Sequence, residues 1–217
     1  YREFLQCDAD IFGSDSPYAD AEVIALSIDI YKQLGFPQAI VRINDRELLK
    51  DIPYEAIAAI DKLKKIGEDG VIAEMVKKGI NKEKANEYVR AIETLKPNET
   101  MTIILSYLTS MGFDENWFVF DPTIARSFSY STGPIWEVEI PGFSGSVLGG
   151  ERFDRLVEQV SGTSIPGTGF GLGFDRTLEA AEQFNLLPES KTSTAVLVTI
   201  FSPSLQGTTL QTLKQLR

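Results

Sequence analysis

Histidine is absent from this chain of 217 residues, and cysteine occurs once, as Cys7. Histidine is the commonest general base and metal ligand of proteins. Its absence, with only one thiol, excludes a Ser-His triad and a structural zinc site within the chain. A single cysteine also excludes an internal disulfide, so we expect a reducing compartment. Any catalysis must rest on carboxylates, arginines, backbone groups and the substrates themselves.

Positive charge is also scarce, and long apolar runs are missing. The chain has 21 Lys and Arg residues and 31 Asp and Glu residues, which gives a formal net charge of −10. This balance disfavours sequence-independent nucleic-acid binding on a broad basic surface, although it permits a local basic groove. No apolar stretch approaches the length of a membrane span, and no signal peptide opens the chain. We therefore expect a cytoplasmic protein with one large domain, or one domain and an insertion.

The first half of the chain predicts strands, one helix and then a helical segment. Residues 1–13 alternate apolar and polar side chains, which indicates a strand with one polar face. Asp20 is suited to cap a helix that ends at Gly35, and residues 38–44 form the next strand. Residues 47–111 have helical spacing at 54–66, 68–78, 82–95 and 99–111, which we interpret as a helical insertion. Its lysines, at positions 62, 64, 65, 77 and 78, are typical of a solvated helix face, and a binding role stays open.

The second half returns to strands. They are predicted at 117–120, 134–140, 145–148 and 167–173, with helices at 153–160 and 175–184. Consecutive strands without crossover helices favour an antiparallel sheet, so the predicted fold class is α+β. Residues 195–201 predict one more strand, and the helical run that follows, 210–216, stops abruptly. We therefore expect the chain to be a fragment of a longer protein.

The glycine-dense stretch GTGFGLGFDR, residues 167–176, admits two interpretations. It is only loosely similar to a nucleotide-binding fingerprint, and no Gly-Lys-Ser/Thr follows it. Either the strand needs close approach to its backbone, or its flat backbone is a platform for a purine base. In the second case Arg176, at the helix start, would reach a phosphate or stack on the base. The residues alone do not decide between the two.

Four segments, in order, resemble the motifs of class II aminoacyl-tRNA synthetases of the histidyl type. YREFLQCDADIFG (1–13) resembles the second half of motif 2, and GFDRTLEAAEQF (173–184) resembles motif 3. FDPTIARSFSYSTGPIWEVE (120–139) and LGGERFDRLVEQVSG (148–162) are similar to the two histidine-specific segments. AVLVTIF (195–201) resembles the start of an anticodon-binding domain. The resemblance thus covers nearly the whole chain.

This resemblance implies an α+β fold: an antiparallel class II catalytic core flanked by helices, with a helical insertion. Residues 1–46 and 112–190 would be the two parts of the core, 47–111 the insertion, and 191–217 the start of a truncated anticodon-binding domain. The implied activity is ATP-dependent activation of histidine to histidyl-adenylate and its transfer to tRNA(His), with Mg²⁺ accompanying ATP, by a homodimer. Two alternatives remain: a regulatory paralogue of histidine biosynthesis without aminoacylation, and a ligase with another amino acid or acceptor.

The same resemblance implies roles for individual residues. Arg126 would be the catalytic residue, in contact with the substrate carboxylate and the α-phosphate of ATP. Gln6 and Asp10 align with residues that hold the amino acid, the acidic one facing the imidazole. Residues four apart on a strand share a face, so both could line one pocket. Tyr130 aligns with the first tyrosine of the family's signature pair. The implied sites are completed by Ser131 and Phe153 for histidine, and by Phe4, Gly171, Gly173 and Arg176 for ATP.

Both histidine-specific segments depart from the family pattern, which usually has Gly-Leu-Asp-Tyr-Tyr where this chain has Ser127-Phe128-Ser129-Tyr130-Ser131. Ser131 stands where the second tyrosine of the pair is usual, and Phe153 stands in place of another tyrosine. Glu151 occupies a position where a third glycine is common. Because a buried polar recognition group changes specificity by large factors, we expect these exchanges to bear on which side chain the pocket selects.

Overall fold

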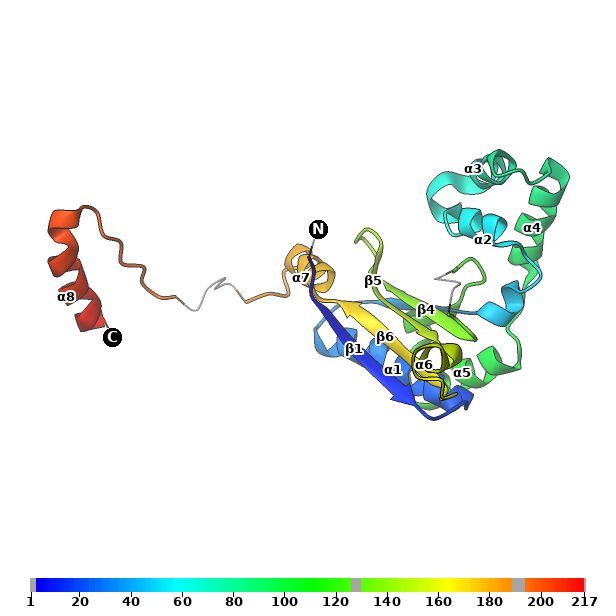
Figure 1. The fold of residues 1–217 in the computed structure, drawn as a ribbon, viewed down its shortest axis with the longest axis horizontal. Coiled ribbons are helices and arrows are strands. Elements are labelled where there is room, and N and C mark those ends of the chain that lie inside the picture. The colour runs from blue at the N-terminus through cyan, green and yellow to red at the C-terminus, as the bar shows by residue number, and fades with distance from the viewer. Residues whose placement is uncertain (1–2, 126–129, 189–193, 217) are drawn as a thin grey trace. The chain divides into compact units, whose positions relative to one another are not determined.

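The computed structural model describes residues 3–125, 130–188 and 194–216. The chain divides into two compact units, Tyr1–Leu186 and Leu187–Arg217. The first unit contains a six-stranded sheet in the order β1-β6-β5-β4-β2-β3 (Figure 1). Every neighbouring pair is antiparallel except β2 and β3, and this confirms the predicted α+β class. The strands are β1 (Gln6–Phe12), β2 (Ile40–Asp45), β3 (Phe118–Phe120), β4 (Pro134–Glu139), β5 (Ser146–Arg152) and β6 (Gly167–Gly173).

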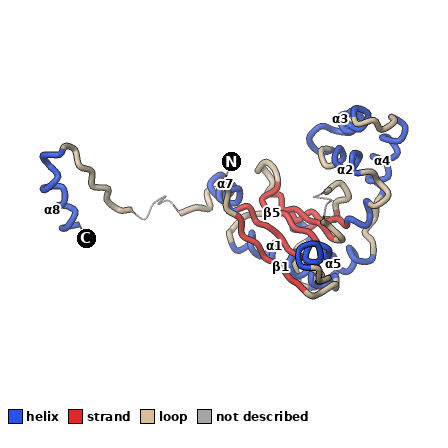
Figure 2. Tube along the Cα trace, in the orientation of Figure 1, coloured by secondary structure: helices blue, strands red, loops and turns tan. Residues whose placement is uncertain are grey.

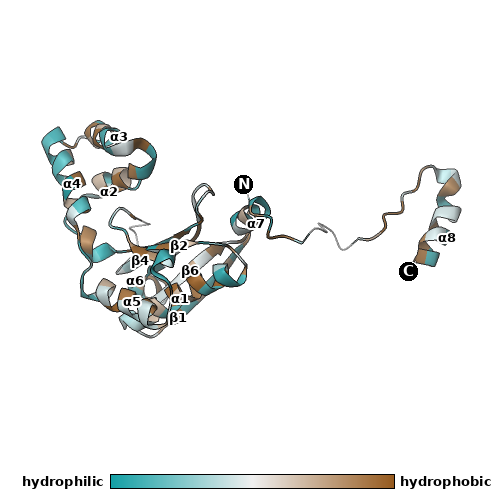
Figure 3. Ribbon diagram, turned by 180° about the vertical axis from the view of Figure 1, so that it is seen from behind, coloured by the Kyte–Doolittle hydropathy of each residue, from teal (hydrophilic) through white to brown (hydrophobic). Residues whose placement is uncertain are grey.

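Helices α1, α5 and α7 pack against one face of this sheet (Figure 2). The pocket described below lies on the other face, and α6 contributes to its lining. Side chains of α1, α5 and α7 join the apolar side chains of the strands in one core. Figure 3 shows apolar residues on these strands and helices. The α-helices are α1 (Pro17–Gln33), α2 (Tyr54–Ile60), α3 (Leu63–Lys77), α4 (Lys82–Thr94), α5 (Glu99–Ser110), α6 (Asp154–Ser161), α7 (Phe174–Gln183) and α8 (Gln206–Leu216), and the 3₁₀ helices are η1 (Arg46–Leu49), η2 (Glu115–Trp117) and η3 (Pro203–Leu205).

Helix α1 begins earlier than its sequence predicts. Ser16 is the N-cap, since its hydroxyl accepts a hydrogen bond from the Tyr18 N–H, and Pro17 occupies the first turn, where a missing N–H costs nothing. The prediction that Asp20 caps this helix is therefore wrong: Asp20 is buried and pairs with Arg152. Gly35, with φ of +83°, follows the end of the helix as predicted, in the left-handed conformation that glycine adopts readily.

The helical segment between β2 and β3 is divided between two cores. Helices α2, α3 and α4 bury their own cluster, which includes Ile57, Ile60, Met75 and Ile92. Helix α5, by contrast, packs in the core of the sheet. Within residues 47–111, the separate core is therefore formed by α2, α3 and α4, and α5 does not belong to it. Amphipathic helices of similar composition do not reveal from sequence which core they join.

The second unit contains η3 and α8. Residues 195–201 are not in a strand, so the strand predicted there is wrong. A strand needs a hydrogen-bonded neighbour, and residues 194–216 offer none. Apolar side chains in this segment are consequently exposed, Phe201 at 92% and Leu197 at 81%. In neither unit is any described helix long and apolar enough to cross a membrane.

Candidate functional site

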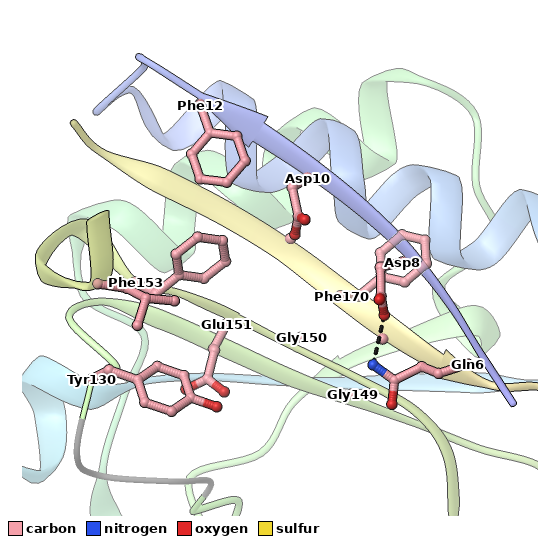
Figure 4. Close-up of a pocket in the computed structure, with 13 residues that line it drawn as sticks. Gln6, Asp8, Asp10, Phe12, Tyr130, Gly149, Gly150, Glu151, Phe153 and Phe170 are labelled. Carbon is pink, nitrogen blue, oxygen red and sulfur yellow. Dashed lines mark hydrogen bonds between the residues drawn. The ribbon is translucent and has the colours of Figure 1, made fainter. Parts of the chain in front are cut away.

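A cavity of about 450 Å³ lies on the face of the sheet that the core leaves open. Strand β1 forms one wall because its side chains alternate: Ala9 and Ile11 pack against the core, while Gln6, Asp8 and Asp10 face the cavity. Figure 4 shows these side chains converging with residues of β5, the start of α6 and the segment before β4. The cavity is lined by Gln6, Asp8, Asp10, Phe12, Tyr130, Gly149, Gly150, Glu151, Phe153, Leu156, Gly169, Phe170 and Gly171.

The floor of the cavity is made of glycine, because β1 side chains lie directly over β6. An ideal Cβ on Gly169 would come within 1.9 Å of Asp10 Oδ1, and one on Gly171 within 2.3 Å of Gln6 Nε2. Any larger residue at these two positions would displace the polar wall of the pocket. Close approach to the backbone, the first of the two interpretations of this strand, is therefore what these glycines provide. Whether the strand also supports a purine base stays a prediction.

The lining is rich in carboxylates. Asp8 accepts a hydrogen bond of 2.6 Å from Gln6 Nε2. Burial, and then the neighbouring charge of Asp8, raise the pKa of Asp10 above its ordinary value. Glu151 is only 8% exposed and accepts a hydrogen bond from the Ser131 hydroxyl. No lysine or arginine is among the described lining residues, so the pocket favours a ligand that carries positive charge and N–H donors.

Aromatic side chains close the end of the pocket nearest α6. The rings of Phe12 and Phe153 meet edge to face, with centroids 5.8 Å apart, and Leu156 adds an apolar surface. Apolar walls with a few convergent polar groups are typical of small-molecule sites. The shape and chemistry of this end suit a flat polar ring.

Below this end of the pocket, Arg152 joins four segments of the chain. Its guanidinium contacts Asp20 through Nε and Nη2, at 2.8 to 3.1 Å, and Asp154 through Nη1 at 3.0 Å. It also donates to the carbonyl oxygens of Ser14 and Ser16, in the turn that follows β1. The side chain is 6% exposed, so these bonds replace nearly all of its contact with water. Arg152 thereby fixes the end of β1, the start of α1 and the start of α6 around the pocket.

A second cavity, of about 210 Å³, lies on the same face of the sheet. The cross-strand register forms a continuous row, Asp8–Gly171–Gly149–Glu137–Arg42, and directly opposed residues share a face. The first three members line the first cavity and the last two line the second. The second cavity is completed by Asp61, Lys64, Lys65, Thr123, Ile124, Glu139, Gly145 and Ser146.

Arg176 borders this second cavity through the turn between β4 and β5. Its guanidinium donates to the carbonyl oxygens of Ser144 and Ser146, and it lies 4.9 Å from the ring centroid of Phe143. Lys64, from the start of α3, reaches the cavity from the other side and pairs with Glu139 at 3.5 Å. Cationic groups therefore lie at this cavity beside the carboxylates of Asp61, Glu137 and Glu139, whereas the described lining of the first cavity has no cationic group.

The predicted site residues fall into four groups. Gln6, Asp10, Tyr130, Phe153 and Gly171 all line the first cavity, while Ser131 contacts it through Glu151. Arg176 borders the second cavity, whereas Gly173 lines neither cavity, and an ideal Cβ on Gly173 would come 3.3 Å from the Val147 carbonyl oxygen. Phe4 is 65% exposed and lines neither of the two. Arg126 lies outside the described residues.

Sequence reasoning missed two acidic members of the pocket. Asp8 has the same parity on β1 as Gln6 and Asp10, so the alternation could have placed it there. Glu151 was noted only as a departure from a glycine. Its place in the pocket depends on the pairing of β5 with β6, which no local pattern gives.

The protein-family model that matches is described as Histidyl-tRNA synthetase, over residues 77–177. Among curated relatives, the histidine–tRNA ligase of Korarchaeum cryptofilum is 36% identical over 89% of this chain, and that of Aeropyrum pernix is 38% identical over 83%. The chain spans about half the length of these relatives, 51% and 47%.

Solved structures agree with the sequence relatives. A histidyl-tRNA synthetase from Nostoc sp. PCC 7120 aligns with 99% of this chain and 59% of its own, with a TM-score of 0.74 and 26% identity. An ATP phosphoribosyltransferase regulatory subunit/histidyl-tRNA synthetase from Bacillus halodurans aligns with 82% of this chain and 53% of its own, with a TM-score of 0.62 and 26% identity. By sequence and by fold, the chain belongs to the family of histidyl-tRNA synthetases and their close homologues.

Proposed function

We propose that this chain is the catalytic part of a ligase that activates histidine with ATP to histidyl-adenylate and transfers the histidyl group to tRNA(His). The observation that carries the proposal is the first cavity. Four residues that the family resemblance assigns to histidine, Gln6, Asp10, Tyr130 and Phe153, line it together, although they come from three separate parts of the chain. Most of the lining polar groups are acceptors, which matches the N–H-rich histidine molecule.

The reaction needs no nucleophile from the protein, which is compatible with a chain that lacks histidine. The carboxylate of the amino acid attacks the α-phosphorus of ATP, and pyrophosphate leaves. Negative charge develops on the phosphate oxygens, so positioning and fixed positive charge are what the protein must supply. In this proposal Arg126 supplies that charge between the amino-acid carboxylate and the α-phosphate, and Arg176 supplies it along the phosphate chain.

ATP would occupy the glycine-floored row from Gly171 toward the second cavity. Gly173 and Phe4 belong to this proposed ATP site by resemblance, and Lys64 and Lys65 add positive charge beside the second cavity. Among the described residues, no three His, Cys, Asp or Glu side chains form a group that could hold a metal ion. Mg²⁺ usually binds to one or two carboxylates and to substrate phosphates, and Glu137 is a carboxylate at the second cavity. Such an ion would neutralise phosphate charge.

The remaining parts of the proposal concern organisation and partners. Residues 1–46 and 112–190 would form the catalytic core, 47–111 the helical insertion, and 191–217 the start of an anticodon-binding domain. A second copy of the chain would complete a homodimer. The cytoplasm is the compartment that we propose for it.

An ATP–pyrophosphate exchange screen on the full-length protein, with each of the twenty amino acids in turn, tests this function. We expect exchange with histidine and little with the others. Asp10→Ala should weaken histidine binding more than ATP binding, because Asp10 lines only the histidine cavity of the two. Exchange with another amino acid would favour a ligase of altered specificity, and no exchange with any amino acid would favour a non-catalytic homologue.

A further inference from the structure

The position of Glu151 gives the pocket a second carboxylate opposite Asp10. In the sheet, Asp10 pairs with Gly169, and Gly169 pairs with Glu151, so the three residues form one row across β1, β6 and β5. Residues directly opposed in antiparallel strands share a face. The two acidic side chains therefore stand on the cavity face, separated by a strand position that has no side chain. Figure 4 shows Asp10 and Glu151 on the two sides of β6.

The spacing of this row suits a small ring. Adjacent strands lie about 4.8 Å apart, which puts the Cα atoms of Asp10 and Glu151 roughly 10 Å apart. The Asp10 carboxylate leans over Gly169, toward β5, since an ideal Cβ there would come within 1.9 Å of its Oδ1. In the arrangement proposed below, a five-membered ring would lie over this row with a charge-assisted hydrogen bond of about 2.8 Å to each carboxylate.

We propose that Glu151 is a specificity-determining residue of this pocket: together with Asp10 it holds the imidazole ring of the substrate between two carboxylates, so that both ring nitrogens donate and the ring binds as imidazolium. A carboxylate only accepts hydrogen bonds, whereas a neutral imidazole has one donor nitrogen and one acceptor nitrogen. With a carboxylate at each end, the neutral ring would turn one lone pair toward a negative charge. This inference rests on the proposed function and adds the protonation state that the site selects.

The surroundings of Glu151 bear on how its carboxylate meets the ligand. One of its oxygens accepts the hydrogen bond of the Ser131 hydroxyl. The other titratable groups that line the cavity are Asp8 and Asp10 of β1 and Tyr130, while the described residues of β6 and α6 in the lining are glycine or apolar. Arg152, the neighbour of Glu151 on β5, engages Asp20 and Asp154 instead.

The test compares histidine with 1,2,4-triazolyl-3-alanine in the full-length protein. This analogue has the shape of histidine, but its ring is far less basic and stays neutral near pH 7. We expect kcat/KM for pyrophosphate exchange to favour histidine by roughly tenfold to hundredfold, the range of one hydrogen bond to a charged group. In Glu151→Gln the preference should fall toward unity, because the amide can donate to an acceptor nitrogen. Glu158→Gln, at an exposed glutamate of α6, is the matched control and should keep the preference.

Outcomes for the inference and for the proposed function are separable. Wild-type protein that uses both amino acids equally well, or a Glu151→Gln variant with an unchanged preference, would overturn the inference and leave histidine activation standing. Calorimetric titration of both ligands covers the case of absent exchange. If histidine then still binds more tightly than the triazole analogue and Glu151→Gln loses this difference, the activity fails and the inference holds. If neither ligand binds, both fail. Wild-type protein that binds both ligands equally well would overturn the inference even if Glu151→Gln folds poorly.

Discussion

Removing the charge of Asp20 should destabilise the protein far more than its place in the first turn of a surface helix suggests. Asp20 is 1% exposed, and its carboxylate accepts three contacts from Nε and Nη2 of Arg152. In Asp20→Asn the side chain keeps its size, but the guanidinium is left buried without its main counter-charge. The remaining partners of Arg152 are Asp154 and two backbone carbonyl oxygens.

The expected loss follows from the burial of both partners. Breaking one side of a buried ion pair costs about 3–5 kcal/mol, because the charge that stays behind is neither solvated nor compensated. For a chain of this size each kcal/mol lowers Tm by about 2–4 °C, so the shift should be roughly 6–20 °C. Replacing both partners, as in Asp20→Leu with Arg152→Met, should cost less than the sum of the two single changes, since neither variant side chain is charged.

Urea unfolding of the full-length protein, followed by far-UV circular dichroism, measures these differences. Glu22→Gln is the matched control, because Glu22 is an exposed acid two residues further along α1, and it should change stability by less than about 0.5 kcal/mol. An Asp20→Asn variant within about 1 kcal/mol of the wild type would refute the reasoning. So would a double variant whose loss equals the sum of the single losses, because the two side chains would then not be coupled.

Three further changes test the glycine floor, an ion cluster and a buried hydroxyl. Gly169→Ala should remove most histidine binding in calorimetry, because the new Cβ would fall 1.9 Å from Asp10 Oδ1. Gly207→Ala, where an ideal Cβ meets open space, should bind histidine normally. Histidine binding by Gly169→Ala would contradict the need for glycine at this position. Burial alone would raise the pKa of Asp121, but hydrogen bonds from Thr123 and Arg42 lower this pKa below its ordinary value of 3.8. Asp121→Asn should therefore lower the free energy of unfolding, measured with urea at pH 7, by roughly 1.5–3 kcal/mol. The difference between variant and wild type should vanish as the pH falls below 3.8, and a difference independent of pH would count against this prediction. Tyr31→Phe removes a buried 3.1 Å hydrogen bond to α7 and should cost about 1 kcal/mol, and equal urea midpoints would show that this bond adds nothing.

Local patterns predicted the elements of the fold well. Alternation along 1–13 marked β1 and its polar face, and the glycine after α1 marked the end of that helix. These features depend on neighbours in sequence, which a single chain displays directly. The same patterns predicted a strand at 195–201, where apolar side chains occur but no described strand forms backbone hydrogen bonds with this segment.

Contacts between distant residues account for what the sequence did not predict. Asp20 and Arg152 are 132 residues apart, so a polar residue in a first turn was interpreted as a cap and not as half of an ion pair. The order of the strands likewise depends on pairing, and this pairing brings Gly169 between Asp10 and Glu151. Sequence spacing placed Gln6 and Asp10 on one face, but it did not reveal what stands opposite them.

The exchanges at Ser131 and Glu151 show how a resemblance can give the reaction class and leave the pocket chemistry open. Taken singly, each departs from the family pattern: a tyrosine is missing at one position and a side chain is added at the other. In the fold, the hydroxyl of one donates to the carboxylate of the other, so the two changes act as a pair. A serine alone would leave space where a phenol is usual. The pair instead provides a hydrogen-bonded carboxylate within the pocket, and an acceptor at this place bears on which protonation state of the substrate binds best.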